Sequence, residues 1–207
     1  QYFDNELFQE YCETHSFEGK KNQILSVPPS FSKSENLTFL VGLGEDKEDN
    51  NFYDIGTLIG SKIKSDAEIK FLNNGGNTNL IIDGILYVQY KFNNYKSEDD
   101  SSINNITFQD LDSSENEIKK NSVFWVRDLI NIPALDKSPE EFINKVKELV
   151  DSSDIEVEVY DKKWLEKNDF GGVLGVGKGS DRPPYFLVGK YNSKAKYQVS
   201  LIGKGVL

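Results

Sequence analysis

Hydrophobic residues recur along the chain at two spacings, one typical of helices and one typical of strands. Helical spacing predicts helices at residues 1–13, 52–64, 78–92, 114–130, 139–150 and 162–167. Alternating or continuous apolar runs predict strands at residues 23–27, 37–43, 67–72, 104–108, 155–160, 185–190 and 197–202. Helices and strands that alternate at this pitch predict an α/β layer fold with a largely parallel or mixed sheet.

Polar residues at the expected helix starts support this assignment. Ser138 precedes Pro139 and two glutamates, an order typical of an N-cap followed by the first helical turn. Asp161 is the expected cap of the helix at 162–167. Ser113 or Ser114 is the expected N-cap of the longest helix, and Glu117 follows Ser114 at capping-box spacing.

Turn and loop residues separate these elements. We expect a solvated acidic loop at 45–51, a turn at 73–76, a polar loop at 97–102 and a glycine-rich turn at 171–179. The boundary between two domains is expected at the end of the longest helix, within residues 131–137.

Composition and charge narrow the classes of partner. The 207 residues are 37% hydrophobic and include 13 Phe and 10 Tyr, enough to fill a core. The formal net charge of −10 argues against nucleic acid and against an anionic membrane surface, because both are bound through Lys and Arg. The sequence contains no run of about 18 apolar residues, so we expect no membrane span.

Cysteine and histidine are too few for several kinds of chemistry. The single cysteine, Cys12, excludes an internal disulfide and favours a reducing, cytoplasmic compartment. Cys12 and His15 have C-x-x-H spacing, but a metal site needs further ligands, so packing and surface roles are expected.

Two glycine-rich motifs resemble nucleotide-binding loops without completing them. The run GVLGVGKG at 172–179 lacks the Ser or Thr that should follow Lys178, and Pro183-Pro184 opposes the helix that should follow. The run VGLG at 41–44 lacks the third glycine of a dinucleotide fingerprint and precedes an acidic loop. We therefore expect a glycine-rich turn at the first motif, a strand-ending turn at the second, and no bound nucleotide.

Lys204 is the residue whose position most favours chemistry. It lies between Gly203 and Gly205 at the expected carboxyl end of the last strand, which is where α/β folds collect their sites. A neutral lysine amine can ligate a metal. A surface position is the alternative.

Several stretches, in order, resemble the leucine aminopeptidase (cytosol aminopeptidase) family of dinuclear-metal exopeptidases. They are FEGK at 17–20, LVGLG at 40–44, VRDLINIP at 126–133, SPEEF at 138–142, IEVEVYDKKWLEK at 155–167, VLGVGKGSDRPP at 173–184 and LIGKG at 201–205. The resemblance implies a macro-domain-like N-terminal domain at residues 1–130, with its first strand missing. It implies that residues 131–207 begin a truncated metallo-aminopeptidase catalytic domain.

The resemblance also implies an activity and a metal site. The full-length enzyme is expected to use two divalent ions, Zn or Mn, to polarise the scissile carbonyl and deliver a bridging hydroxide. Lys204 resembles the lysine that coordinates one of these metals, whereas the family's carboxylate ligands follow its D-S-G-G run, beyond Leu207. We therefore expect no catalytic residue within this chain, no metal bound by it alone, and no activity from it alone.

The expected partners follow from the same resemblance. Full-length relatives remove bulky apolar N-terminal residues from peptides and assemble as homohexamers in the cytoplasm. An alternative is a non-catalytic binding or assembly module of macro-domain type. A P-loop nucleotide hydrolase is disfavoured by Gly179 and Pro183.

Overall fold

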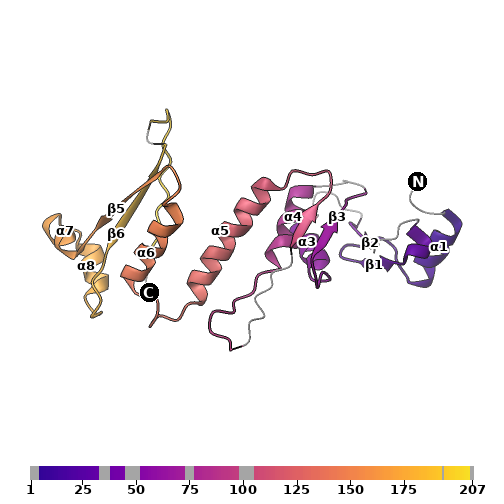
Figure 1. The fold of residues 1–207 in the computed structure, drawn as a ribbon, viewed down its shortest axis with the longest axis horizontal. Helices are drawn as coiled ribbons and strands as arrows, with labels where there is room; N and C mark the ends of the chain where they lie inside the picture. Colours follow the sequence, from indigo (N-terminus) through magenta and orange to yellow (C-terminus); the bar gives the residue numbers. More distant parts are fainter. Residues whose placement is uncertain are drawn as a thin grey trace. The chain divides into compact units, whose positions relative to one another are not determined.

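The computed structural model describes residues 5–32, 38–44, 52–72, 77–97, 105–192 and 194–205. The chain divides into two compact units, Gln1–Val126 and Arg127–Leu207, and the division falls inside one long helix (Figure 1). Within the ranges described, we find no helix long and apolar enough to cross a membrane.

The first unit contains the elements that the periodicity predicts, with bounds that differ by a few residues. They are α1 (Asn5–Thr14), β1 (Ile24–Val27), α2 (Pro29–Ser32), β2 (Thr38–Val41), α3 (Phe52–Gly60), β3 (Ala67–Ile69), α4 (Thr78–Tyr87), β4 (Ile106–Phe108) and most of α5 (Ser114–Asn131). The single-turn helix α2 was not predicted. The predicted loop at 45–51 and turn at 73–76 lie outside the described residues, as does most of the loop at 97–102.

The strands pair in both orientations. β1 and β2 are antiparallel, β3 and β4 are parallel, and β5 (Ile155–Tyr160) and β6 (Phe186–Tyr191) are antiparallel. The α/β class is confirmed, and its mixed pairing is distributed over three two-stranded sheets among the described residues. The parallel pair is joined through α4, as expected for a strand–helix–strand crossover.

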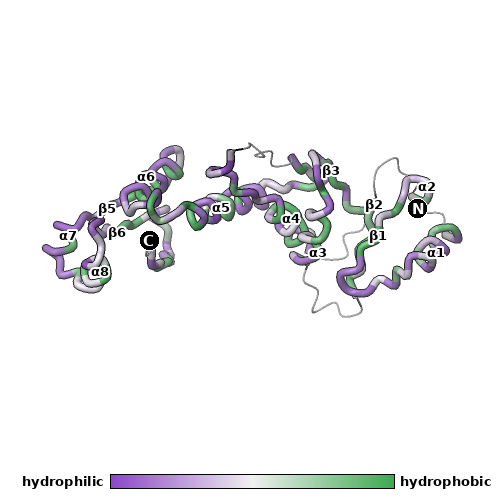
Figure 2. The backbone as a smooth tube through the Cα atoms, turned by 90° about the horizontal axis from the view of Figure 1, so that it is seen from below, coloured by the Kyte–Doolittle hydropathy of each residue, from purple (hydrophilic) through white to green (hydrophobic). Residues whose placement is uncertain are grey.

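The core of the first unit lies between α4 and β4. Ile82, Ile85 and Leu86 pack with Ile106 and Phe108, and each of these side chains is at most 8% exposed. Figure 2 shows hydrophobic positions along much of α3 and α4. Burying each such side chain contributes about 1.5–3 kcal/mol to the free energy of folding, before the cost in conformational entropy.

Two glycines allow α3 and α4 to approach closely. A Cβ atom at Gly56 would lie 2.1 Å from the Ile81 carbonyl oxygen, and one at Gly84 would lie 2.1 Å from the Tyr53 carbonyl oxygen. Any larger residue would push the two backbones apart.

Glycine also shapes the segment after β2, which ends at Val41 as the VGLG motif predicted; the chain beyond Gly44, where a turn would be completed, lies outside the described residues. Gly44 has φ +76°, and its amide donates to the Gly19 carbonyl oxygen at 2.9 Å. A Cβ at Gly42 would lie 2.1 Å from the Lys20 carbonyl oxygen. Packing therefore explains this glycine motif without a nucleotide.

The start of α5 corrects one detail of the prediction. Ser114 is the first residue of α5, and Ser113, in the N-cap position, accepts the Glu117 amide on its carbonyl oxygen at 2.9 Å. The Ser114 amide donates to Asp112 at 3.0 Å, which lowers the pKa of that carboxyl. The Ser114–Glu117 capping box is therefore wrong, because Ser114 is already helical.

The second unit confirms two predicted caps. α6 (Pro139–Val150) begins after Ser138, whose Oγ accepts the Glu141 amide at 3.1 Å. α7 (Lys162–Lys167) begins after Asp161, whose Oδ1 accepts the Trp164 amide at 2.9 Å. These bonds satisfy amides that the helix itself leaves unpaired.

The glycine-rich segment is a helix, so the predicted turn at 171–179 is wrong. α8 spans Gly171–Gly177, and the Leu174 amide donates to the Phe170 carbonyl oxygen at 3.1 Å. Gly177 lies against Pro184, with 2.9 Å from a built Cβ to the proline Cβ. Short-range bonds and this contact outweigh the low helix propensity of glycine.

The strand predicted at 197–202 is absent, since the segment has no regular secondary structure. Tyr197, Val199, Leu201 and Ile202 are 79–96% exposed. A strand requires a neighbour to satisfy its amides and carbonyls, and β5 and β6 pair with each other. The alternating pattern alone was therefore insufficient.

Candidate functional site

Lys204, the predicted metal ligand, lies in the exposed irregular segment at the end of the second unit. Neither of the glycines beside it is required by packing, because a Cβ atom at Gly203 or at Gly205 would meet no atom within 4 Å. The structure therefore places the lysine amine where an approaching group can reach it, but not at the end of a strand.

The described residues do not form a metal centre around this lysine. No group of three or more His, Cys, Asp or Glu side chains among them is arranged to hold an ion. A dinuclear site needs several oxygen or nitrogen ligands, and one exposed amine does not supply them. The described residues alone do not fit a dinuclear metal centre.

Cys12 lies on α1 and is partly buried, and His15 directly follows the helix and is exposed. The His15 ring lies 4.1 Å from the Tyr11 ring, and its Nδ1 is 2.9 Å from the Tyr11 carbonyl oxygen. Partial burial raises the pKa of the Cys12 thiol, so the reactive thiolate is disfavoured.

A shallow cavity of about 340 Å³ adjoins the glycine-rich helix in the second unit. Lys178 and Arg182 line it, together with residues of α7. Arg182 donates to the carbonyl oxygens of Ala134 and Leu135 at 2.8 and 3.0 Å, so its guanidinium holds the segment before α6. The glycine-rich segment is wound into α8, with the Leu174 amide bonded to the Phe170 carbonyl oxygen, whereas a phosphate loop directs its amides at the ligand.

Charged side chains on β5 and β6 form a network that the sequence analysis missed. Glu158 accepts hydrogen bonds from Lys190 and from the Tyr160 hydroxyl. The bond from Lys190, then that from Tyr160, lowers the pKa of Glu158, and the same bonds raise the pKa of both donors. In the register of the sheet, Glu158 lies opposite Val188, and Lys190 lies opposite Glu156. Glu158 and Lys190 are therefore diagonal neighbours on the two paired strands.

Tyr160 also belongs to a cluster of aromatic rings, and Leu165 of α7 is fully buried. Tyr160 and Trp164 lie 4.1 Å apart between centroids, and Phe170 lies 5.3 Å from Phe186. This cluster joins α7 to the sheet, so we assign these aromatic residues to structure rather than to a binding site.

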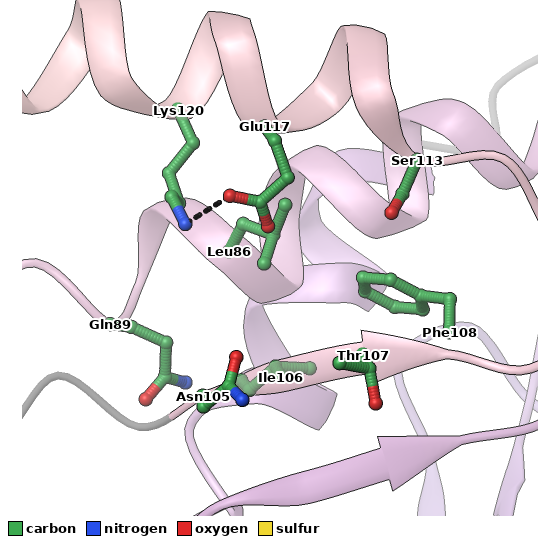
Figure 3. A pocket seen from close by; sticks show the side chains of 9 residues that line it. All are labelled: Leu86, Gln89, Asn105, Ile106, Thr107, Phe108, Ser113, Glu117 and Lys120. Carbon is green, nitrogen blue, oxygen red and sulfur yellow. Dashed lines mark hydrogen bonds and ion pairs between the residues drawn. The ribbon is translucent and has the colours of Figure 1, made fainter.

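A second cavity, of about 290 Å³, lies within the first unit (Figure 3). Leu86, Ile106 and Phe108 supply apolar surface from the core, and Gln89 lies at one end. The Gln89 carboxamide nitrogen donates to the Gly60 carbonyl oxygen at 2.8 Å, which fixes this end of the cavity.

An ion pair on α5 faces the same cavity. Figure 3 shows Glu117 and Lys120 directed from α5 towards β4, where they bond to each other. The Lys120 side chain is 19% exposed and that of Glu117 is 36% exposed. The sequence offered only their helical spacing as a signal, because the cavity depends on strands and helices distant in sequence.

Comparison with known proteins identifies the class of the second unit. Residues 124–207 match the family described as the cytosol aminopeptidase family, catalytic domain. The probable cytosol aminopeptidase 1 of Shewanella oneidensis is 28% identical over 212 residues, covering 93% of this chain and 41% of that protein. A probable cytosol aminopeptidase of Mycobacterium tuberculosis is 33% identical over 145 residues, covering 60% of this chain and 28% of that protein.

Solved structures agree on the fold. A tomato leucine aminopeptidase variant matches with a TM-score of 0.69 at 21% identity, over 88% of this chain and 40% of that chain. The bottromycin maturation enzyme BotP in complex with Mn matches with a TM-score of 0.67 at 17% identity, over 86% of this chain and 41% of that chain.

Residues 124–207 thus match the catalytic domain of the cytosol aminopeptidase family, and the chain as a whole is similar to cytosol aminopeptidases over most of its length. It spans about two fifths of the length of the curated relatives that it matches over most of its own length, at 41% and 43% for two of them. The macro-type assignment of residues 1–130 stays a prediction.

Proposed function

We propose that the whole protein is an aminopeptidase that removes N-terminal residues, with bulky apolar ones preferred, from peptides. The observation that carries this proposal is the match of residues 124–207 to the family's catalytic domain. The names of the matched relatives support it, since they are cytosol aminopeptidases in several bacteria.

The proposed enzyme depends on two divalent ions, Zn or Mn, with Lys204 as a ligand of one. The Gly-Lys-Gly element resembles the family's metal-binding lysine, and the fold neighbour BotP was solved with Mn. The open space around Gly203 and Gly205 supports close approach by a group that the described residues do not supply. In this proposal the remaining ligands come from outside these 207 residues.

The proposal extends to assembly and location. We expect a homo-oligomer, specifically a hexamer, in the cytoplasm, on the resemblance to the cytosol aminopeptidases. Sedimentation of the whole protein tests the assembly, and a monomer at working concentration would contradict it.

Substitution of Lys204 in the whole protein tests the metal assignment. Lys204→Ala removes the amine, and Lys204→Arg supplies a guanidinium that stays protonated and repels a cation. Both should lower hydrolysis of leucyl-p-nitroanilide by more than about 100-fold and reduce bound metal, since even supporting residues of metal sites cost about 10–100-fold.

Lys194→Arg is the matched control, because Lys194 is exposed in the same part of the chain. It should leave activity and metal content unchanged. If Lys204→Arg kept normal activity and two bound metals, Lys204 would be a charge contact and the ligand assignment would be wrong.

A further inference from the structure

The cavity of the first unit combines an apolar floor with one charge of each sign. Leu86, Ile106 and Phe108 line the cavity and belong to the packed core, since each is only 2–8% exposed. Glu117 and Lys120 face that surface from α5 (Figure 3). A second ion pair on the same helix, Glu115–Lys119, is far more exposed, at 75% and 46%.

We propose that this cavity binds a free α-amino acid with an apolar side chain. The α-carboxylate of the ligand contacts Lys120, the α-ammonium contacts Glu117, and the aliphatic side chain lies on Ile106 and Phe108. Each charged group of the ligand then meets an opposite charge, and its apolar atoms meet apolar surface.

Electrostatics favour a zwitterion over an ion of one sign. A lone anion that recruited Lys120 would leave Glu117 partly buried without its cation, and a lone cation would do the same to Lys120. An unpaired, partly desolvated charge is costly. The net charge of −10 further disfavours polyanions such as nucleotides.

The size of the cavity points the same way. At about 290 Å³ the cavity is just below the usual range for small-molecule pockets, about 300–1,000 Å³. A single amino acid suits this volume, whereas a dinucleotide is too large for it. Amino-acid binding in the first unit goes beyond the proposed peptidase activity, and it is measurable without catalysis.

Calorimetric titration of L-leucine into the 207-residue chain tests the proposal directly. We expect saturable binding, and we expect N-acetyl-L-leucine and L-leucinamide to bind at least about tenfold more weakly, because each lacks one charge. Absence of saturable L-leucine binding would overturn the proposal. Equal affinity for either single-charge analogue would also overturn it.

Substitutions locate the site. Glu117→Gln and Lys120→Gln should each weaken L-leucine binding by at least about tenfold, with folding checked by circular dichroism. Glu115→Gln and Lys119→Gln make the same charge changes on the same helix and should leave binding unchanged. Unchanged binding in Glu117→Gln, or an equal loss in the controls, would reject this location. If a cavity variant does not fold, the analogue series on the unaltered chain still decides.

Discussion

The two units of the chain differ in how far their apolar side chains are buried. In the first unit, α4 and β4 bury a contiguous cluster in which Ile85 is fully inaccessible. In the second unit, Leu165 is buried equally well, yet residues of the segment from Tyr197 to Ile202 are 79–96% exposed. The second unit is also the one that matches the catalytic domain of the family.

The buried core that the contrast points to lies in the first unit, whereas the proposed metal ligand, Lys204, lies in the second. The first unit has a buried core, close helix packing and a formed cavity. The second unit carries the recognisable motifs and Lys204, but the apolar side chains Tyr197, Val199, Leu201 and Ile202 of its terminal segment are largely exposed. Substitutions should therefore act very differently in the two units.

The largest expected difference is between Ile85→Ala and Leu201→Ala. Ile85 is fully buried, so its truncation should lower the free energy of unfolding by about 2–5 kcal/mol. Leu201 is 94% exposed, so the same kind of truncation should change the free energy of unfolding by less than about 0.5 kcal/mol. Urea unfolding of both variants measures this, and equal losses would erase the proposed contrast.

A smaller difference is expected between two glycines that are both inside helices. Gly84→Ala places a Cβ 2.1 Å from the Tyr53 carbonyl oxygen and should cost about 1–3 kcal/mol. Gly175→Ala in α8 meets no atom within 4 Å and should stabilise the helix by about 0.5–1 kcal/mol. Thermal unfolding compares the two, and a destabilising Gly175→Ala would show that α8 is wrongly described.

The smallest effect concerns pH and Glu158. The pKa of Glu158 is lowered in the folded chain, so its bonds to Lys190 and Tyr160 stabilise the fold above the unfolded-state pKa of about 4.3. That contribution is lost as pH falls through the lower folded-state pKa. The melting-temperature difference between wild type and Glu158→Gln should therefore shrink on acidification.

Glu148→Gln, at an exposed position on α6, is the control for this pH series. It should show no such narrowing. A difference between wild type and Glu158→Gln that stays constant with pH would mean that the network is not formed in solution.

Local signals in the sequence were reliable where the structure is local. Ser138 and Asp161 cap their helices as predicted, because an N-cap bond spans only three residues. The buried pair of Asn116 and Asp83 joins residues 33 apart, and no sequence pattern indicated it. The cavity lined by Glu117 and Lys120 was not predicted either, because its lining residues come from segments distant in sequence.

The two wrong elements also have physical causes. The sequence of α8 is rich in glycine, which favours turns, yet the structure closes it as a short helix against Pro184. The segment at 197–202 alternates as a strand should, but alternation fixes only which side chains share a face. Whether a strand forms depends on a pairing partner, and no partner strand lies beside it among the described residues.

The most direct test of the account is the activity of the 207-residue chain itself. We predict that the purified chain does not hydrolyse leucyl-p-nitroanilide with added Mn²⁺ or Zn²⁺, because its described residues supply one candidate metal ligand, Lys204, and no cluster of others. The whole protein under the same conditions should hydrolyse it in a metal-dependent way. Metal-dependent turnover by the 207-residue chain alone would contradict the account.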